Sequence, residues 1–370
     1  MSLSTFSFPT KVLYGVSAIE NLPAELEKRG MRRPLLVTDQ GLRKTAVLER
    51  GRQLVSHAPL FSGVDPNPTE HNVLEGSSFY KENDCDSVIG LGGGSPIDAA
   101  KAIRLKVTHP LELAAYDDNI GGEAKITRDL PPFIAIPTTA GTGSEVGRST
   151  VITIAATNRK TVIFSPYLIP DLAVADPALT VAMPPKITAG TGMDAFTHNV
   201  EAYLSKPFHP ICDAIALGGS KIVYEHLPRV MRDPNDLESR GQMMIAAMMG
   251  AIAFQKGLGA VHSLAHPLSS EFGMHHGTSN AVLLPAVLEF NRSAVPNRFA
   301  ELKRYLGKDI AECTAELNEI CGILPRLRDY GVPEDALPPL AEKALEDGCH
   351  LLNPRPCTRE SLLELYQSSW

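Results

Sequence analysis

The residues best suited to metal chemistry lie in the second half of the chain. Asp194 and His198 are four positions apart in GMDAFTHNVEAY, and His262 and His266 repeat this spacing in AVHSLAHPL. On a helix, that spacing places two side chains on one face, about one turn apart. The pattern therefore predicts two helices that each present a pair of potential metal ligands.

Two further histidines, His275 and His276, follow in GMHHGTSN, so four of the eleven histidines fall within fifteen positions. Neutral imidazoles combined with one carboxylate suit Fe²⁺, Zn²⁺, Co²⁺ or Ni²⁺. Any one of these side chains could instead be a helix cap, a surface residue or a hydrogen-bonded core histidine. The joint pattern favours a metal site, but spacing alone leaves open which of the four clustered histidines are ligands.

A glycine run in the first half is suited to binding phosphate. The segment 92–96, GGGSP, follows an apolar run typical of a strand and opens a helical pattern. Glycines allow close backbone approach to a pyrophosphate, and a helix N-terminus offers unpaired N–H donors. The run is not the GxGxxG fingerprint, and a tight strand-to-helix turn would have the same sequence.

Two other segments strengthen the prediction of a dinucleotide site. The segment 138–144, TTAGTGS, also follows a strand and is rich in hydroxyl groups. Asp39 comes directly after the first predicted strand, where an acid can accept hydrogen bonds from a ribose and repel a 2′-phosphate. Asp39 therefore favours NAD over NADP, although it could equally be a helix N-cap.

The pattern of predicted elements changes near residue 183. Before it, short β-rich runs alternate with helical patterns, which indicates a parallel sheet covered on both faces. The expected strands are 34–38, 87–91, 133–136 and 172–175, with a hairpin at 151–155 and 161–164 and helices at 42–54 and 97–106. After it, helical spacing covers 191–205, 210–229, 237–255, 261–272, 280–292, 312–330 and 339–345. We expect an α/β dinucleotide-binding domain with a Rossmann-like parallel sheet over residues 1–183, and an all-α metal-binding domain over 184–370.

Composition excludes several other classes of protein. The net charge of −7 argues against a nucleic-acid surface. The longest apolar run, 243–254, is about a dozen residues, whereas a membrane span needs roughly 20. The N-terminus lacks the pattern of a signal peptide, and the six cysteines are scattered without a CxxC pair. We therefore expect no membrane, a reducing environment and a cytoplasmic location.

Taken together, these segments resemble the iron-containing (group III) alcohol dehydrogenase family. The resemblance covers nearly the whole chain, from about residue 8 to 370. Its most specific parts are GGGSPIDAAKAI, PTTAGTGSEV, TGMDAFTHNVEAYLS and GLGAVHSLAHPLSSEFGMHHGTSNAVLLPAVLEFN. Within the family, the chain looks close to the lactaldehyde reductase (1,2-propanediol oxidoreductase) branch.

The resemblance implies roles for individual residues. The implied metal ligands are Asp194, His198, His262 and His276. His266 matches a histidine beside the metal, and His275 matches no ligand. The positions implied to touch the dinucleotide are Asp39, Asn67, Gly93, Gly94, Ser95, Asp98, Thr138, Thr139, Thr142 and Lys160. One departure is Gly147, where many members have threonine, so a hydroxyl near the expected cofactor site is missing.

The expected activity is hydride transfer between NAD(H) and a small alcohol or aldehyde whose oxygen is polarised by Fe²⁺, with Zn²⁺ as the alternative metal. His266 is expected to relay the proton or to hold the site's shape. The alternatives are a zinc-dependent polyol dehydrogenase of the glycerol type and a dehydroquinate-synthase-like lyase. The family suggests a homodimer.

Overall fold

The computed structural model describes residues 10–370. They divide into two compact units, which we describe separately. The sheet unit comprises residues 10–139 and Gly143–Met183, and the helical unit comprises Ala140–Thr142 and Pro184–Trp370. The short segment Ala140–Thr142 belongs to the helical unit because its backbone packs closely against Thr191 of that unit. A Cβ added at Gly141 would lie 2.8 Å from the carbonyl oxygen of Thr191.

The sheet unit is built on six parallel strands in the order β1-β8-β5-β4-β2-β3. The strands are β1 (Lys11–Tyr14), β2 (Pro34–Asp39), β3 (Leu60–Val64), β4 (Ser87–Gly92), β5 (Phe133–Pro137) and β8 (Leu172–Ala175). From β2 the chain moves outward to β3, whereas from β4 it moves to β5 on the opposite side. The strand order therefore reverses between the neighbours β2 and β4, which is where open α/β sheets bind ligands.

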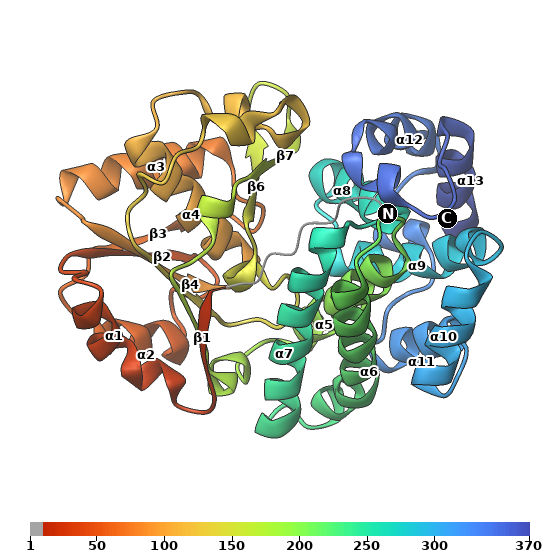
Figure 1. Ribbon diagram of the computed structural model, residues 1–370, viewed down its shortest axis with the longest axis horizontal. Coiled ribbons are helices and arrows are strands. Elements are labelled where there is room, and N and C mark those ends of the chain that lie inside the picture. Colours follow the sequence, from red (N-terminus) through yellow and green to blue (C-terminus); the bar gives the residue numbers. More distant parts are fainter. Residues whose placement is uncertain (1–9) are drawn as a thin grey trace. The chain divides into compact units, whose positions relative to one another are not determined.

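Apolar side chains cover both faces of this sheet. Along β2, Leu35 and Val37 join one buried cluster, whereas Leu36 joins the other, as the alternation of side chains in a strand requires. Helices α1 (Leu22–Lys28) and α2 (Ala46–Leu54) cover one face, and α3 (Glu70–Glu82) and α4 (Gly94–Thr108) cover the other (Figure 1). The strands are therefore buried on both sides, which explains their nearly continuous apolar sequences.

The predicted hairpin is present beside α4. Strands β6 (Ser149–Ile154) and β7 (Arg159–Phe164) pair antiparallel, with Thr153 opposite Lys160. Alternate residues of β6 are buried, and Ile152 and Ile154 join the same cluster as α3 and α4. The hairpin is thus packed onto the sheet unit by one apolar face.

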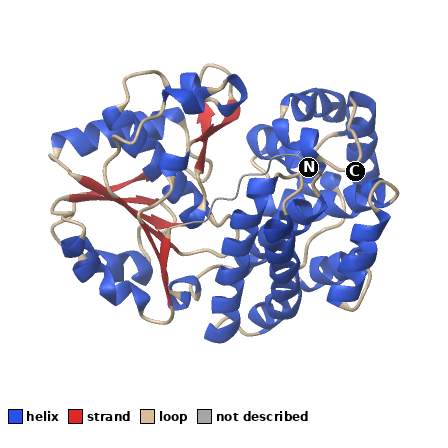
Figure 2. Ribbon diagram, in the orientation of Figure 1, coloured by secondary structure: helices blue, strands red, loops and turns tan. Residues whose placement is uncertain are grey.

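Among the residues described here, the helical unit contains no strand (Figure 2). Its α-helices are α5 (Pro185–Leu204), α6 (Pro210–Arg232), α7 (Leu237–Ala253), α8 (Ala260–Phe272), α9 (His276–Arg292), α10 (Pro296–Leu306), α11 (Ile310–Ile320), α12 (Leu337–Glu346) and α13 (Arg359–Ser369). Helix α5 is buried along most of its length and packs against α6, α7 and α9. The predicted fold class, a parallel α/β domain followed by an all-helical domain, is confirmed.

Some boundaries differ from those expected. The predicted helix 312–330 is present in its first half, but its end is wrong, because α11 ends at Ile320 and only a 3₁₀ turn, Leu327–Tyr330, follows. Gly322 lies between them with φ of 64°, a left-handed conformation that ends a helix. Strands β1 and β3 and helices α1, α3, α10 and α13 were not predicted. Within residues 10–370 no single helix is long and apolar enough to cross a membrane. One bent pair of helices, Leu237–Lys256 with Ala260–Phe272, meets the length and composition criteria for a span, and nothing beyond these two criteria supports one.

Candidate metal centre

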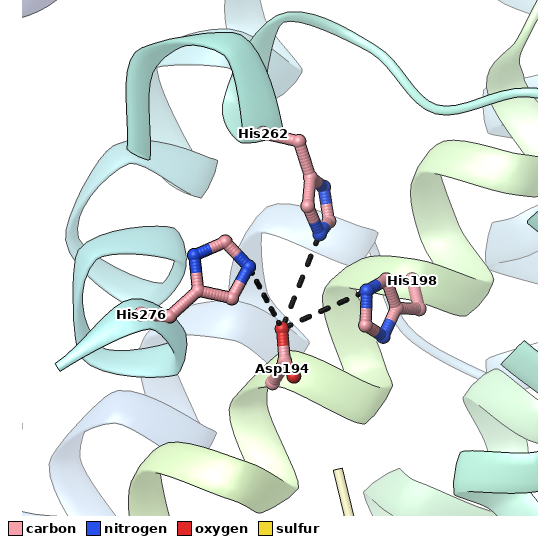
Figure 3. A group of neighbouring side chains, drawn as sticks. All are labelled: Asp194, His198, His262 and His276. Carbon is pink, nitrogen blue, oxygen red and sulfur yellow. Dashed lines mark ion pairs between the residues drawn. The ribbon is translucent and has the colours of Figure 1, made fainter. Parts of the chain in front are cut away.

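Three helices bring four potential ligands together. Helix α5 carries Asp194 and His198, α8 carries His262, and α9 begins at His276. The Nε2 atoms of His198, His262 and His276 lie 3.8, 4.0 and 3.5 Å from Oδ1 of Asp194. Figure 3 shows the three rings arranged around this oxygen. One ligand atom from each residue lies within 4.8 Å of all the others.

Close backbone approach allows this arrangement. A side chain at Gly277 would place its Cβ 1.9 Å from the carbonyl oxygen of Gly190, so α9 starts against α5 only because position 277 is glycine. His276 is the preceding residue. A side chain at Gly190 would in turn meet the ring of His275 at 2.5 Å. His275 therefore packs against α5 and is not one of the four converging residues.

The chemistry of the group suits a divalent transition metal. Three imidazole nitrogens and one carboxylate oxygen form a mixed N/O set of the kind that binds Fe²⁺ or Zn²⁺. Burial lowers the pKa of His198 to about 4, so this imidazole is neutral and its nitrogens can act as ligands. The rings of His198 and His262 are stacked at 4.7 Å, which fixes their relative orientation.

Two residues that the sequence reasoning missed hold these ligands in place. The buried carboxylate of Glu201 lies 2.6 Å from Nδ1 of His262. The amide nitrogen of Asn280 donates to Oδ1 of Asp194 at 2.9 Å and lies 3.5 Å from Nε2 of His262. Helical spacing could have found Glu201, because it is seven positions after Asp194 and shares its face of α5.

The loops predicted to contact a dinucleotide follow neighbouring parallel strands of the sheet unit. Asp39 ends β2, and its Oδ1 accepts a hydrogen bond from the Leu42 backbone N–H at 2.9 Å. Gly93 and Gly94 open α4 directly after β4. Asn67 lies in the loop that follows β3. The carboxyl ends of these adjacent strands therefore present the predicted residues along one edge of the sheet.

Hydrogen bonds connect these loops to one another. The hydroxyl of Ser95, in the first turn of α4, donates to the carbonyl of Pro66 at 2.6 Å and so ties the loop containing Asn67 to the glycine turn. The backbone N–H of Thr138 donates to the Gly92 carbonyl at 2.9 Å. A side chain at Gly93 would meet Thr139 at 3.1 Å, so the turn packs closely against the residues that follow β5.

Comparison with known proteins identifies the family. The family model described as "Iron-containing alcohol dehydrogenase" matches residues 9–177, and that described as "Fe-containing alcohol dehydrogenase family, C-terminal" matches residues 188–370. This chain belongs to the iron-containing alcohol dehydrogenase family. The predicted oxidoreductase class, an alcohol dehydrogenase or aldehyde reductase, is therefore confirmed, and a lyase is not supported.

Relatives within the iron-containing alcohol dehydrogenases match over nearly their full length. The 4-hydroxybutyrate dehydrogenase of Cupriavidus necator is 41% identical over 97% of this chain and 98% of its own. The structure of a 1,3-propanediol oxidoreductase has a TM-score of 0.94 at 35% identity, covering 99% of this chain and 100% of that chain. The sulfoacetaldehyde reductase from Bifidobacterium kashiwanohense, solved in complex with NAD⁺, has a TM-score of 0.91 at 29% identity, covering 100% and 99%. These matches support the family but not specifically the lactaldehyde reductase branch.

In this iron-containing alcohol dehydrogenase, Asp98 is enclosed by the sheet unit's own groups. Its carboxylate accepts hydrogen bonds from the Ser144 hydroxyl at 2.5 Å and the Val151 N–H at 3.0 Å. Burial raises the pKa of Asp98, whereas the charges of Lys101 and Lys160 oppose that rise. Asp98 and Lys160 are both among the predicted cofactor residues, and the charge of Lys160 favours the ionised form of Asp98.

Lys101, which the sequence reasoning missed, holds the backbone of residues 144–149 in place. Its fully buried ammonium donates to the carbonyls of Ser144, Gly147 and Ser149 at 2.7, 3.1 and 2.8 Å. The backbone of Gly147, where many family members have threonine, is therefore fixed from α4. Thr142, the last predicted cofactor residue, belongs to the helical unit.

Proposed function

We propose that this protein is an NAD(H)-dependent alcohol dehydrogenase or aldehyde reductase whose substrate oxygen binds a divalent metal. Asp194, His198, His262 and His276 would hold the metal, with Fe²⁺ as the expected ion and Zn²⁺ as the alternative. The observation that carries the proposal is the convergence of these four side chains, with one ligand atom from each within 4.8 Å of the others. The family match supports the same assignment.

The chain's own residues set the conditions for this chemistry. When bound, the ion would supply Lewis acidity that favours the alkoxide of an alcohol or polarises an aldehyde. Asn280 and Glu201 fix the orientation of Asp194 and His262 through hydrogen bonds of 2.9 and 2.6 Å. The ligand set is therefore pre-organised, which reduces the reorganisation needed for binding.

The sheet unit would bind the dinucleotide, whose nicotinamide carries the hydride. Gly93, Gly94 and Ser95 would receive the pyrophosphate at the N-terminus of α4, where no side chain of the N-cap residue pairs with the first backbone N–H groups. Asp39 would accept hydrogen bonds from the adenosine ribose. The NAD⁺ complex of the sulfoacetaldehyde reductase supports this choice of cofactor. Asn67, Asp98, Thr138, Thr139, Thr142 and Lys160 complete the proposed contacts.

His266 is proposed to pass the substrate proton toward solvent. Its ring stacks on that of His276 at 5.3 Å, and its side chain is 18% exposed, so it connects the ligand group with the surface. An imidazole is suited to proton transfer near neutral pH. A His266→Ala variant that keeps full activity and an unchanged pH profile would rule out the relay and leave His266 with a role in shape alone.

The substrate is proposed to be a short primary alcohol with a second polar group. Two relatives are named for 4-hydroxybutyrate and 1,3-propanediol, which both combine a terminal hydroxyl with another polar end. 1,2-Propanediol, the substrate of the lactaldehyde reductase branch, is an isomer of 1,3-propanediol and also combines a terminal hydroxyl with a second hydroxyl. We also propose a homodimer, which light scattering after size-exclusion chromatography would test.

The first experiment removes bound metal and then adds back either Fe²⁺, under anaerobic conditions, or Zn²⁺. NADH absorbance is followed with four alcohols: 4-hydroxybutyrate, 1,3-propanediol, 1,2-propanediol and ethanol. We expect activity restored by Fe²⁺, with the bifunctional alcohols preferred to ethanol. Activity with Zn²⁺ alone would favour a zinc-dependent polyol dehydrogenase. No NADH formation with any combination, despite measured NAD binding, would contradict the proposed function for these substrates.

A further inference from the structure

Glu201 contacts both the backbone and a side chain of α8. Its Oε1 accepts a hydrogen bond from the Val261 backbone N–H at 2.8 Å, and its Oε2 accepts from the His262 backbone N–H at 3.4 Å. The same Oε2 lies 2.6 Å from Nδ1 of His262. Glu201 and His262 are almost fully buried, with 4% and 1% of their surface exposed, respectively. The carboxylate thus contacts the first turn of α8 and the ring of a proposed metal ligand together.

The start of α8 requires this external partner. The residue before the helix is Gly259, which has no side chain to cap the first N–H groups. A Cβ at Gly259 would lie 2.7 Å from Oε1 of Glu201 and 2.9 Å from Oδ1 of Asn353. Asn353 accepts from the Ala260 N–H at 3.2 Å. Two buried side chains from elsewhere in the unit therefore replace the usual N-cap.

The hydrogen bonds also determine which nitrogen of His262 carries the proton. Both oxygens of Glu201 already accept backbone N–H groups, so in the 2.6 Å contact with Oε2 the donor is Nδ1 of His262. In the neutral ring, Nε2 then keeps its lone pair. This is the atom that lies 4.0 Å from Oδ1 of Asp194 and belongs to the converging group. The unprotonated Nε2 of His262 therefore points toward the other proposed ligands.

We propose that Glu201 is a positioning residue that fixes the tautomer and orientation of His262 for metal binding, in addition to capping α8. This inference rests on the proposed function for the presence of a metal. A carboxylate that receives the other N–H of a ligand histidine also makes the ring a stronger ligand. Glu201 lies on the same helix as Asp194 and His198, so α5 supplies two ligands and orients a third.

The test compares Glu201→Gln with Asn353→Ser. A glutamine keeps the shape and can still accept from one backbone N–H. The single amide oxygen cannot accept from both the Val261 N–H and Nδ1 of His262, and while it stays on Val261 the NH₂ group faces Nδ1 and cannot accept its hydrogen. Asn353→Ser removes the parallel cap at Ala260 without changing any contact to His262. Both variants should lower the melting temperature of the metal-free protein, so they share the structural defect and differ at the histidine.

Metal affinity is measured directly, without an activity assay, by titrating the metal-free proteins with Co²⁺ against a competing chelator and recording the visible spectrum. Glu201→Gln should bind Co²⁺ about 10–100-fold more weakly than the unchanged protein, with altered absorption bands. Asn353→Ser should keep the affinity and the spectrum. Equal weakening in both variants, or unchanged binding in Glu201→Gln, would overturn the proposal.

Two further readings keep this test distinct from the proposed function. Nitrogen chemical shifts of labelled His262 in the metal-free protein report the tautomer, and the Nδ1–H form should be lost in Glu201→Gln but not in Asn353→Ser. This reading overturns the proposal if the tautomer is the same in all three proteins, even where Glu201→Gln is too unstable for titration. If the unchanged protein does not bind Co²⁺, the proposed metal function fails instead.

Discussion

The Nδ1 atom of His266 lies 2.7 Å from Oδ2 of Asp347. The other oxygen of Asp347 accepts from the Ser263 hydroxyl at 2.8 Å and the Cys349 N–H at 2.9 Å. Burial alone would raise the pKa of Asp347, but His266 and these hydrogen bonds hold it well below its usual range. His262 and His266, one turn apart on α8, thus each have Nδ1 paired with a buried or half-buried carboxylate.

Replacing this carboxylate should affect turnover more than metal binding. In Asp347→Asn, His266 loses its charged partner, so its ring is no longer held in one orientation. We expect kcat to fall about 10–100-fold, in the range typical for partners that orient active-site histidines. Metal content should stay unchanged, because Asp347 contacts none of the four proposed ligands. Steady-state kinetics and metal analysis on the same preparation provide the measurement.

Ser263→Ala is the matched control for Asp347. It removes one hydrogen bond from the same carboxylate but leaves the contact with His266 intact. Its kcat should stay close to that of the unchanged protein. If Ser263→Ala and Asp347→Asn lose turnover equally, Asp347 acts through the packing of its loop and not through His266.

Gly277→Ala should weaken metal binding through the backbone. The added methyl group would overlap the carbonyl of Gly190, so the start of α9 must move away from α5 and carry His276 with it. Overpacking of this kind costs about 1–3 kcal/mol of stability. We expect a lower melting temperature and a weaker affinity for Co²⁺ in the same variant.

Gly218→Ala provides the comparison for Gly277→Ala. Gly218 lies within α6, and its added methyl group would meet only the flexible end of Met249. Alanine is favoured over glycine inside a helix by about 0.5–1 kcal/mol, so stability should hold or rise. Metal affinity should not change. A loss of affinity in both variants would mean that His276 is not specifically displaced.

The sequence predicts those parts of the metal centre whose residues lie close together along the chain. The pair Asp194 and His198 is visible because both lie on one helix at a spacing of four. The choice of His262 and His276 over His266 came only from the family resemblance, because it depends on how α8 and α9 pack. Helical spacing places Glu201 on the same face of α5 as Asp194, but its contact with His262, like the contacts of Asn280, depends on packing between helices, which local periodicity does not record.

The fold shows the same limit. The buried strand β2 was predicted because its apolar run is continuous, whereas β3, LFSGV, is only partly buried and contains glycine and serine. Strand β1 has just four residues at the sheet edge. Helix α10 carries a strongly polar exposed face, so few of its positions are apolar. The error at 312–330 arose because apolar spacing continues past Gly322, where the backbone turns.

Glu145 should make the stability of the sheet unit depend on pH. Burial raises the pKa of its carboxyl from an ordinary value of 4.5 to about 7. Between these values the folded state holds the proton and the unfolded state releases it, so stability falls as pH rises through this window. Glu145→Gln removes the titration. Its unfolding free energy should therefore rise relative to the unchanged protein, by on the order of 1–3 kcal/mol from pH 4.5 to 7.

Denaturant unfolding at several pH values measures this difference. Glu49→Gln, an exposed position on α2 that keeps the same change in charge, is the control and should show no such trend. If the difference between Glu145→Gln and the unchanged protein stays constant across the window, the carboxyl is ionised in the folded state and the expected dependence is contradicted.

Asp39 separates a cofactor role from a structural one. Its carboxylate ends β2 beside the glycine turn and also accepts the Leu42 N–H at 2.9 Å. Asp39→Asn keeps an oxygen that can accept this hydrogen bond and removes the charge that would repel a 2′-phosphate. The melting temperature should hold, while the ratio of kcat/KM for NADP⁺ to that for NAD⁺ should rise about tenfold or more, which corresponds to about 1.4 kcal/mol.

Because burial raises the pKa of Asp39, the assay is best run at mildly alkaline pH, where the carboxylate is ionised. An unchanged cofactor ratio with an unchanged melting temperature would show that the charge has no part in cofactor selection, and Asp39 would then be a cap for the turn that precedes α2.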